Sequence, residues 1–176
     1  MLRRVAAGDR EAFKALYERY QRRLFCYLVK MVNDQGRAEE LTNDVLLEVW
    51  RGAKTYQGRS SPSTWIFGIA RHKALNELRR KGDVPVEPEA LLQVTDPHPG
   101  PGHEVERADL ARLMKAALTK LGPEHREVLE LAYYQGFSIQ EMAEILRCPA
   151  NTVKTRMFYA RQKLKEILPA MGVEER

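Results

Sequence analysis

The stretch from Ser138 to Lys165 reads SIQEMAEILRCPANTVKTRMFYARQKLK and carries the signals for two helices separated by a break. Ser138 followed by Glu141 is a capping box, in which the hydroxyl and the carboxylate each satisfy a backbone amide at the start of a helix. Pro149 has no amide hydrogen and its ring clashes with the turn before it, so the first helix must end there. The stretch therefore predicts a short helix, a tight break at 147–149, and a second helix from about Ala150.

The second of these helices has two unlike faces at a spacing of about 100° per residue. One stripe is apolar and is expected to pack: Val153, Met157, Ala160 and Leu164. The opposite side offers polar groups and two aromatic rings: Asn151, Thr155, Phe158, Tyr159 and Gln162. Five basic and no acidic residues lie between Ala150 and Lys165. This pattern favours a helix that reads the major groove with its cations on phosphates; the alternative is a solvated basic helix in a three-helix bundle.

Charge along the 176 residues alternates in sign. Residues 1–81 hold 17 basic and 9 acidic side chains, residues 82–110 hold 1 and 7, and residues 111–176 hold 11 and 8. Two basic segments flanking an acidic one indicate two contacts with a polyanion, because Lys and Arg that neutralise phosphates release counterions. The longest apolar run, Leu24 to Val29, is too short to span a membrane. We see no signal peptide either, and expect a cytoplasmic protein without membrane insertion.

The acidic segment at 82–104 has the composition of a linker. It contains five of the nine prolines together with Gly100 and Gly102, so an extended, solvated chain is expected. His98 and His103 lie in it without a cysteine or further ligand nearby, and we expect no metal site and no cofactor.

Helical periodicity predicts three helices before the linker and two more between it and Ser138. The first three are expected at about 9–32, 36–54 and 62–81, with a loop at 55–62. After the linker, one helix is expected at about 105–121 and another is opened by Pro123. No β pattern occurs, so the fold class is all-α, with two small helical domains at 1–81 and 105–176.

Trp65 falls on the polar side of the third helix, beside His72, Asn76 and Arg79. A large ring among hydrogen-bonding groups is suited to stack on an unpaired base. The other interpretation is that Trp65 packs under the preceding loop, and both can hold at once. The loop residues are polar enough to form a pocket for an extruded base.

Four motifs in this order resemble the extracytoplasmic-function class of bacterial sigma factors, group IV of the sigma-70 proteins. They are GDREAF at 8–13, ELTNDV at 40–45 leading to Trp50, STWI at 63–66, and CPANTVKTR at 148–156. The resemblance covers nearly the whole chain. It implies two helical domains, region 2 and region 4, with the linker lying in the path of nascent RNA within RNA polymerase.

The resemblance also implies partners and the residues that contact them. Core RNA polymerase would be bound through the β′ clamp helices and the β flap. An acidic face of the second helix would contact the clamp helices, through Glu40, Asn43, Asp44 and Glu48. The alternative is that this face is only solvated. The −10 promoter element would meet the loop and the third helix: Tyr56, Gln57, Gly58, Arg59, Ser60, Ser61, Trp65, Arg71, His72, Asn76 and Arg79. The −35 element would meet the last helix: Asn151, Thr152, Lys154, Thr155, Arg156, Phe158, Tyr159 and Gln162.

Two further implications concern activity. Housekeeping relatives carry a tryptophan pair that props melted DNA, and Gly68 and Ile69 stand at the matching positions, which implies weak intrinsic melting and strict promoter choice. Restraint by an anti-sigma factor is implied as well. The expected function is thus an alternative sigma factor that nucleates DNA melting and is not an enzyme. The rivals are a helix-turn-helix activator that does not bind core polymerase as a sigma subunit, and a nucleic-acid-processing enzyme.

Overall fold

The computed structural model describes residues 1–82 and 104–170, with the backbone alone over 104–111. Within these ranges the chain is helical and contains no strand, which confirms the expected all-α class. The expected linker at 82–104, with His98 and His103, lies outside the described residues except at its two ends. No helix in the described ranges has both the length and the apolar character that a membrane span requires.

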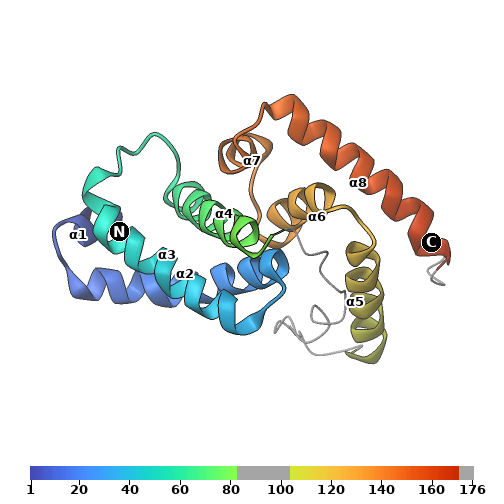
Figure 1. Cartoon of the computed structure of the whole chain (residues 1–176), viewed down its shortest axis with the longest axis horizontal. Helices are drawn as coiled ribbons and strands as arrows, with labels where there is room; N and C mark the ends of the chain where they lie inside the picture. The colour runs from blue at the N-terminus through green and yellow to red at the C-terminus, as the bar shows by residue number, and fades with distance from the viewer. Residues whose placement is uncertain (83–103, 171–176) are drawn as a thin grey trace.

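The helices form an N-terminal unit and a C-terminal unit (Figure 1). The N-terminal unit, residues 1–82, contains α1 (Leu2–Ala6), α2 (Arg10–Val32), α3 (Gln35–Gly52), the 3₁₀ turn η1 (Ala53–Thr55) and α4 (Pro62–Lys81). The C-terminal unit, residues 104–170, contains α5 (Glu104–Thr119), α6 (Pro123–Leu129), the π turn η3 (Glu130–Tyr134), α7 (Ile139–Leu146) and α8 (Ala150–Ala170).

Side-chain caps start the three long helices of the N-terminal unit. Asp9, Asp34 and Ser61 each accept a hydrogen bond from the backbone amide three residues ahead, as N-caps do. Asn33 lies in the left-handed region at φ 52° and ends α2. The helices expected at 9–32, 36–54 and 62–81 are therefore confirmed to within a turn, whereas α1 was not anticipated as a separate helix.

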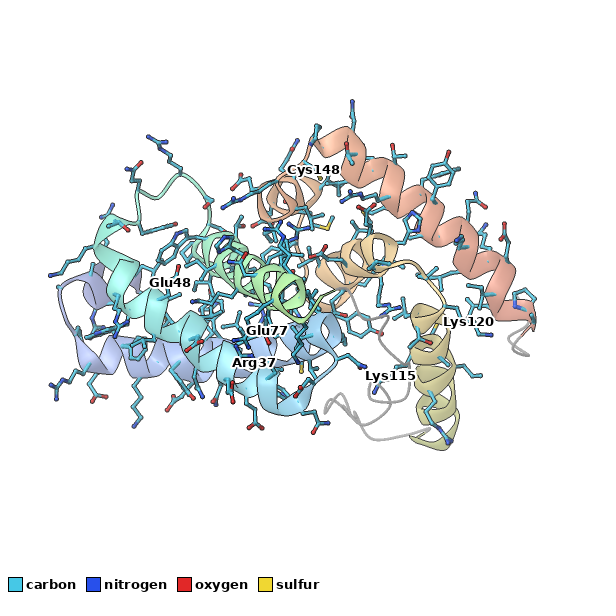
Figure 2. All side chains as sticks on the ribbon, in the orientation of Figure 1. Arg37, Glu48, Glu77, Lys115, Lys120 and Cys148 are labelled. Atoms are coloured by element: carbon cyan, nitrogen blue, oxygen red, sulfur yellow. The ribbon has the colours of Figure 1, made fainter. Side chains whose placement is uncertain are left out.

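The core of the N-terminal unit lies where α2, α3 and α4 pack together. Its largest fully buried side chains include Tyr27, Phe67 and Leu24. Arg37 on α3 and Glu77 on α4 form an ion pair of 2.8 Å beside this core, and Figure 2 shows the two side by side. The Arg37 hydrogen bond holds the pKa of Glu77 below its ordinary value, so the pair ties α3 to α4 as charged groups at neutral pH.

The C-terminal unit is held together by α8, which packs on both α6 and α7. Arg126 on α6 donates to the backbone carbonyls of Leu118, Thr119 and Leu121, and so satisfies the open carbonyls at the end of α5. The continuation of α6 into the π turn was not expected: the amide of Gln135 bonds to the carbonyl of Glu130, five residues earlier, at 3.1 Å.

Candidate nucleic-acid interface

The pair α7 and α8 has the geometry that the sequence predicts. Ser138 Oγ accepts from the Glu141 amide, while Glu141 Oε2 accepts from the Ser138 amide at 2.9 Å, so the capping box is formed. Arg147 adopts the left-handed region at φ 52° and ends α7. Pro149 then precedes α8, and Figure 2 marks Cys148 at this turn.

One face of α8 is buried and the opposite face is open to solvent. Val153, Met157 and Ala160 are buried against α6 and α7. The exposed residues include those expected to read bases: Asn151, Thr155, Phe158, Tyr159 and Gln162. Phe158 and Tyr159 are 51% and 55% exposed with their rings edge to face at 5.5 Å. The predicted phase of this helix is therefore correct.

Not every group on α8 is free to bind as the sequence suggested. Arg156, expected on a phosphate, forms an ion pair of 2.9 Å with Glu124 at the start of α6. The hydroxyl of Thr155 donates to the carbonyl of Asn151 at 2.9 Å. Lys154 is exposed and Thr152 is half-buried. The side chains of Thr155 and Arg156 are thus already held by contacts within the chain.

Trp65 lies partly under the loop that precedes α4. Its ring centroid is 5.1 Å from that of Tyr56, and its edge would lie 3.5 Å from a Cβ at Gly52. The Tyr56 hydroxyl donates to the carbonyl of Ser60, closing the loop on itself. The structure therefore has the packing that was one of the two interpretations of Trp65, while Gln57, Gly58 and Arg59 at the loop tip are exposed.

The remaining −10 candidates fall into two groups. Those at the outer side of α4 are exposed: His72, Asn76 and Arg79, with the first two joined at 3.4 Å. Arg71 and Ser61 instead contact the C-terminal unit. Arg71 pairs with Glu127 on α6 at 2.9 Å, and Ser61 Oγ donates to Glu141 at 3.2 Å. The structure thus does not offer all eleven candidates as one open surface.

The outer face of α3 brings together the four residues expected to bind polymerase. Glu40, Asn43, Asp44 and Glu48 are all exposed. Glu40 pairs with Arg37, and Glu48 pairs with Lys73 at 2.8 Å. Leu47 lies among them and is 44% exposed. The charge-based reasoning left out this apolar side chain, although it follows Asn43 and Asp44 by four and three residues and so shares their helix face.

Metal-binding clusters of three or more His, Cys, Asp or Glu are absent from the described ranges 1–82 and 104–170. The gathered side chains are instead hydrogen-bonding, cationic and aromatic. Such groups bind nucleic acid by base-edge, phosphate and stacking contacts.

Comparison with known proteins gives matches to both units. Residues 16–84 match the family model for sigma-70 region 2, and residues 111–164 match that for sigma-70 region 4. The chain is 30% identical to the ECF RNA polymerase sigma factor SigK of Mycobacterium sp. (strain KMS), over 96% of this chain and 89% of SigK. It is also 30% identical to the ECF sigma factor SigL of Mycobacterium tuberculosis (strain H37Rv), over 96% of both chains.

A solved structure has the same fold. The sigma factor RpoE of Bartonella quintana, crystallised with the anti-sigma factor NepR, aligns with a TM-score of 0.69 at 24% identity, over 90% of this chain and 98% of RpoE.

Proposed function

The chain belongs to the ECF family of RNA polymerase sigma factors, and we propose that its two helical units read the two promoter elements separately. As an alternative sigma factor it directs transcription initiation. The observation that supports this assignment is the difference between the two faces of α8. Polar and aromatic side chains are exposed there, while the apolar stripe is buried.

We assign −35 recognition to α8. Thr155, Phe158 and Tyr159 would contact base edges, because they share the exposed face of a helix that follows a tight turn, as in helix-turn-helix proteins. Lys154 and Arg156 would contact phosphates, which supply affinity without sequence information. Asn151, Thr152 and Gln162 extend the same surface towards the two ends of α8.

The −10 element is assigned to the loop at 56–61 and the outer side of α4. Trp65 is partly buried against Tyr56, so the pair would form a stacking wall beside the loop tip. Exposed His72, Asn76 and Arg79 would continue that wall with hydrogen-bond donors. Contacts of this kind compensate for the few kcal/mol that extrusion of a base costs, and would nucleate melting.

Polymerase binding is assigned to the exposed face of α3. Asp44 and Leu47 lie at its centre, where a carboxylate and an apolar side chain would together meet a complementary helix pair such as the β′ clamp helices. The C-terminal unit would engage the β flap. Residues 82–104 would then connect the two domains, at 1–81 and 105–176, through the polymerase.

Other parts of the proposal depend on the family alone. RpoE of Bartonella quintana was crystallised with an anti-sigma factor, which supports an inhibitor of that class for this chain. We place its activity in the cytoplasm, where polymerase works, and propose no enzymatic step and no cofactor. A helix-turn-helix activator that does not bind core polymerase as a sigma subunit is disfavoured, because the N-terminal unit matches sigma-70 region 2.

Run-off transcription with purified core polymerase tests this function. Addition of the chain to core enzyme on genomic promoter fragments should yield discrete transcripts. An activator would yield none without a resident sigma factor, and a nucleic-acid-processing enzyme would degrade or alter the template. Absence of transcripts from every template would overturn the proposal.

Asp44→Ala isolates the polymerase contact. It should weaken binding to core enzyme about tenfold, as loss of one central interface group does, and leave −35 duplex binding unchanged. Glu18→Gln, an exposed carboxylate on α2, is the matched control and should change neither measurement. Loss of both activities in Asp44→Ala would indicate unfolding rather than a polymerase contact.

A further inference from the structure

Tyr20 of α2 reaches from the core of the N-terminal unit to the first turn of α4. It is 4% exposed, and its hydroxyl lies 2.7 Å from Oγ of Ser63, the second residue of α4. The guanidinium groups of Arg19 and Arg23 lie 6.0 and 5.7 Å from the centre of the Tyr20 ring. Burial and these two cations hold the ring, so its hydroxyl has a defined position.

Ser63 lies between the loop at 56–61 and Trp65, which are both assigned to the −10 element. Ser61 Oγ caps α4 by accepting from the Thr64 amide at 3.1 Å, and the Trp65 amide donates to the Ser61 carbonyl at 3.0 Å. Ser63 belongs to this same turn. A hydrogen bond at Ser63 therefore fixes the turn from which the loop departs and on which Trp65 is carried.

The other contacts of this region act differently. Tyr56 donates its hydroxyl to the Ser60 carbonyl, and its ring centroid is 5.1 Å from that of Trp65. These two contacts set the internal shape of the loop, but they do not fix it relative to α2. Burial of apolar side chains holds α4 in the core, and this attraction is non-directional. The hydrogen bond between Tyr20 and Ser63 is directional, and it links the turn to α2.

We propose that Tyr20 is a positioning residue for −10 recognition, whose hydroxyl holds Ser63 and thereby orients the loop at 56–61 and Trp65 around the base that they would contact. This inference rests on the −10 assignment made above. Tyr20 is buried, so it acts through Ser63 and not by touching DNA. Loss of such a supporting contact lowers selectivity, because the correct base depends most on the geometry of the site.

Tyr20→Phe removes the hydroxyl and keeps the buried ring, so the chain should still fold. The ratio by which the preferred −10 base is bound over the other bases should fall about fivefold, the equivalent of one hydrogen bond. Binding of duplex −35 DNA should not change, since α8 lies in the other unit. Binding of core polymerase should not change either, because its assigned face lies on α3.

Selection of DNA by the holoenzyme, in which the chain is assembled with core RNA polymerase, measures this ratio. The probe is a fork-junction DNA that joins a −35 duplex to a randomised single-stranded −10 segment. The duplex comes from a promoter fragment that yields run-off transcripts. Sequencing of bound and unbound DNA gives the enrichment of each base, and thermal melting verifies that each variant folds.

Tyr17→Phe is the matched control for selectivity. Tyr17 lies about one turn earlier on α2 and donates its hydroxyl to Asn43 on α3 at 3.1 Å. This variant therefore also removes one hydrogen bond between α2 and another helix, and it should leave the base enrichment unchanged. Equal loss of enrichment in Tyr17→Phe and Tyr20→Phe would assign the effect to general loosening of α2 and would overturn the inference.

Ser63→Ala tests the same hydrogen bond from its other side. It should lower the enrichment as Tyr20→Phe does, and the double variant should lower it no further, because both changes remove one shared interaction. Losses that add in the double variant would show that the two residues act independently, and would contradict the positioning role.

The inference and the proposed function fail on different results. Enrichment that Tyr20→Phe retains in full would overturn the positioning role alone. A wild-type holoenzyme that enriches no base in the single-stranded segment would overturn the −10 assignment itself, and the positioning role with it.

Discussion

The helices α4 and α8 are both assigned to DNA, yet they differ in what covers them. On α8, Phe158 and Tyr159 are more than half exposed. On α4, Arg71 is 17% exposed and paired with Glu127, and Phe67 is fully buried against the C-terminal unit. The comparison teaches that a helix with suitable side chains becomes a binding surface only when its neighbours in the fold leave those side chains free.

Phe67→Ala on the covered helix α4 should have the largest effect on stability. Truncation of a fully buried phenylalanine costs about 3–5 kcal/mol through lost contacts and the remaining cavity, so the free energy of unfolding should fall by that amount in urea titrations. Phe158→Ala is the matched control, since an exposed ring contributes within about 0.5 kcal/mol. Equal destabilisation by both changes would mean that Phe158 is buried against another part of the chain.

Tyr159→Ala tests the open side. One specific contact to a base edge is worth about 1–3 kcal/mol of discrimination, so preference at one −35 position should relax by about ten- to a hundredfold. Thr155→Ala should act at a neighbouring position, by less, because the hydroxyl already bonds to the Asn151 carbonyl. Selection of −35 sequences from a randomised duplex measures both; unaltered preference would mean that the reading face is wrongly assigned.

The carboxylate Glu141, which contacts the start of α4, should make the stability of α7 depend on pH. Its pKa lies below the ordinary 4.5, chiefly because the Ser138 amide donates to it. A lowered folded pKa contributes stability that is present above about pH 4.5 and is lost as the pH falls through the folded value.

Acidification should therefore loosen α7 and its contacts with Ser61 and Thr64, with a loss of about 1 kcal/mol for the cap. Hydrogen exchange of the Glu141 and Met142 amides between pH 6 and pH 3 would follow this change. Glu141→Gln should remove the dependence. The same pH profile in that variant would assign the loss to another carboxylate.

Changes at Arg156 and Glu124 on the exposed side of α8 are expected to have the smallest effect on DNA affinity. Arg156→Ala should weaken binding across all sequences and reduce the slope of log affinity against log salt by about one, as loss of one phosphate contact does. Glu124→Gln frees the Arg156 guanidinium from an ion pair in which the Glu124 side chain is 64% exposed and the Arg156 side chain 21%, worth about 1 kcal/mol or less. It should raise affinity less than fivefold; a decrease would show that Glu124 positions Arg156 for DNA.

Local signals account for the parts of the fold that were predicted. The capping box at Ser138, the break before Pro149 and the apolar stripe through Val153 each act within a few residues, so the ends and phase of α7 and α8 followed from the sequence. The three long helices of the N-terminal unit followed in the same way. The exposure of Asp44 and its neighbours on α3 was likewise predicted, although their role is still a proposal.

The features that the sequence left open share a physical cause. The π turn after Leu129 carries no distinct propensity that would separate it from an α-helix. The packing of Trp65, one of the two interpretations given for it, depends on Tyr56 in a loop, and the ion pair of Arg156 depends on Glu124, thirty-two residues away. Helical periodicity predicts which face of a helix carries a side chain, but it does not predict which residue of another segment packs against that face.

Alone, the sequence determined that this protein is helical in two basic units, and that its last helix turns a polar, aromatic face to solvent. Those properties follow from backbone capping and from the period of the apolar residues. The tertiary structure decided that the C-terminal unit lies on α4, through contacts such as Arg71 with Glu127, fifty-six residues apart. Such pairing depends on the three-dimensional packing of separately formed helices, and no local pattern in the chain encodes it.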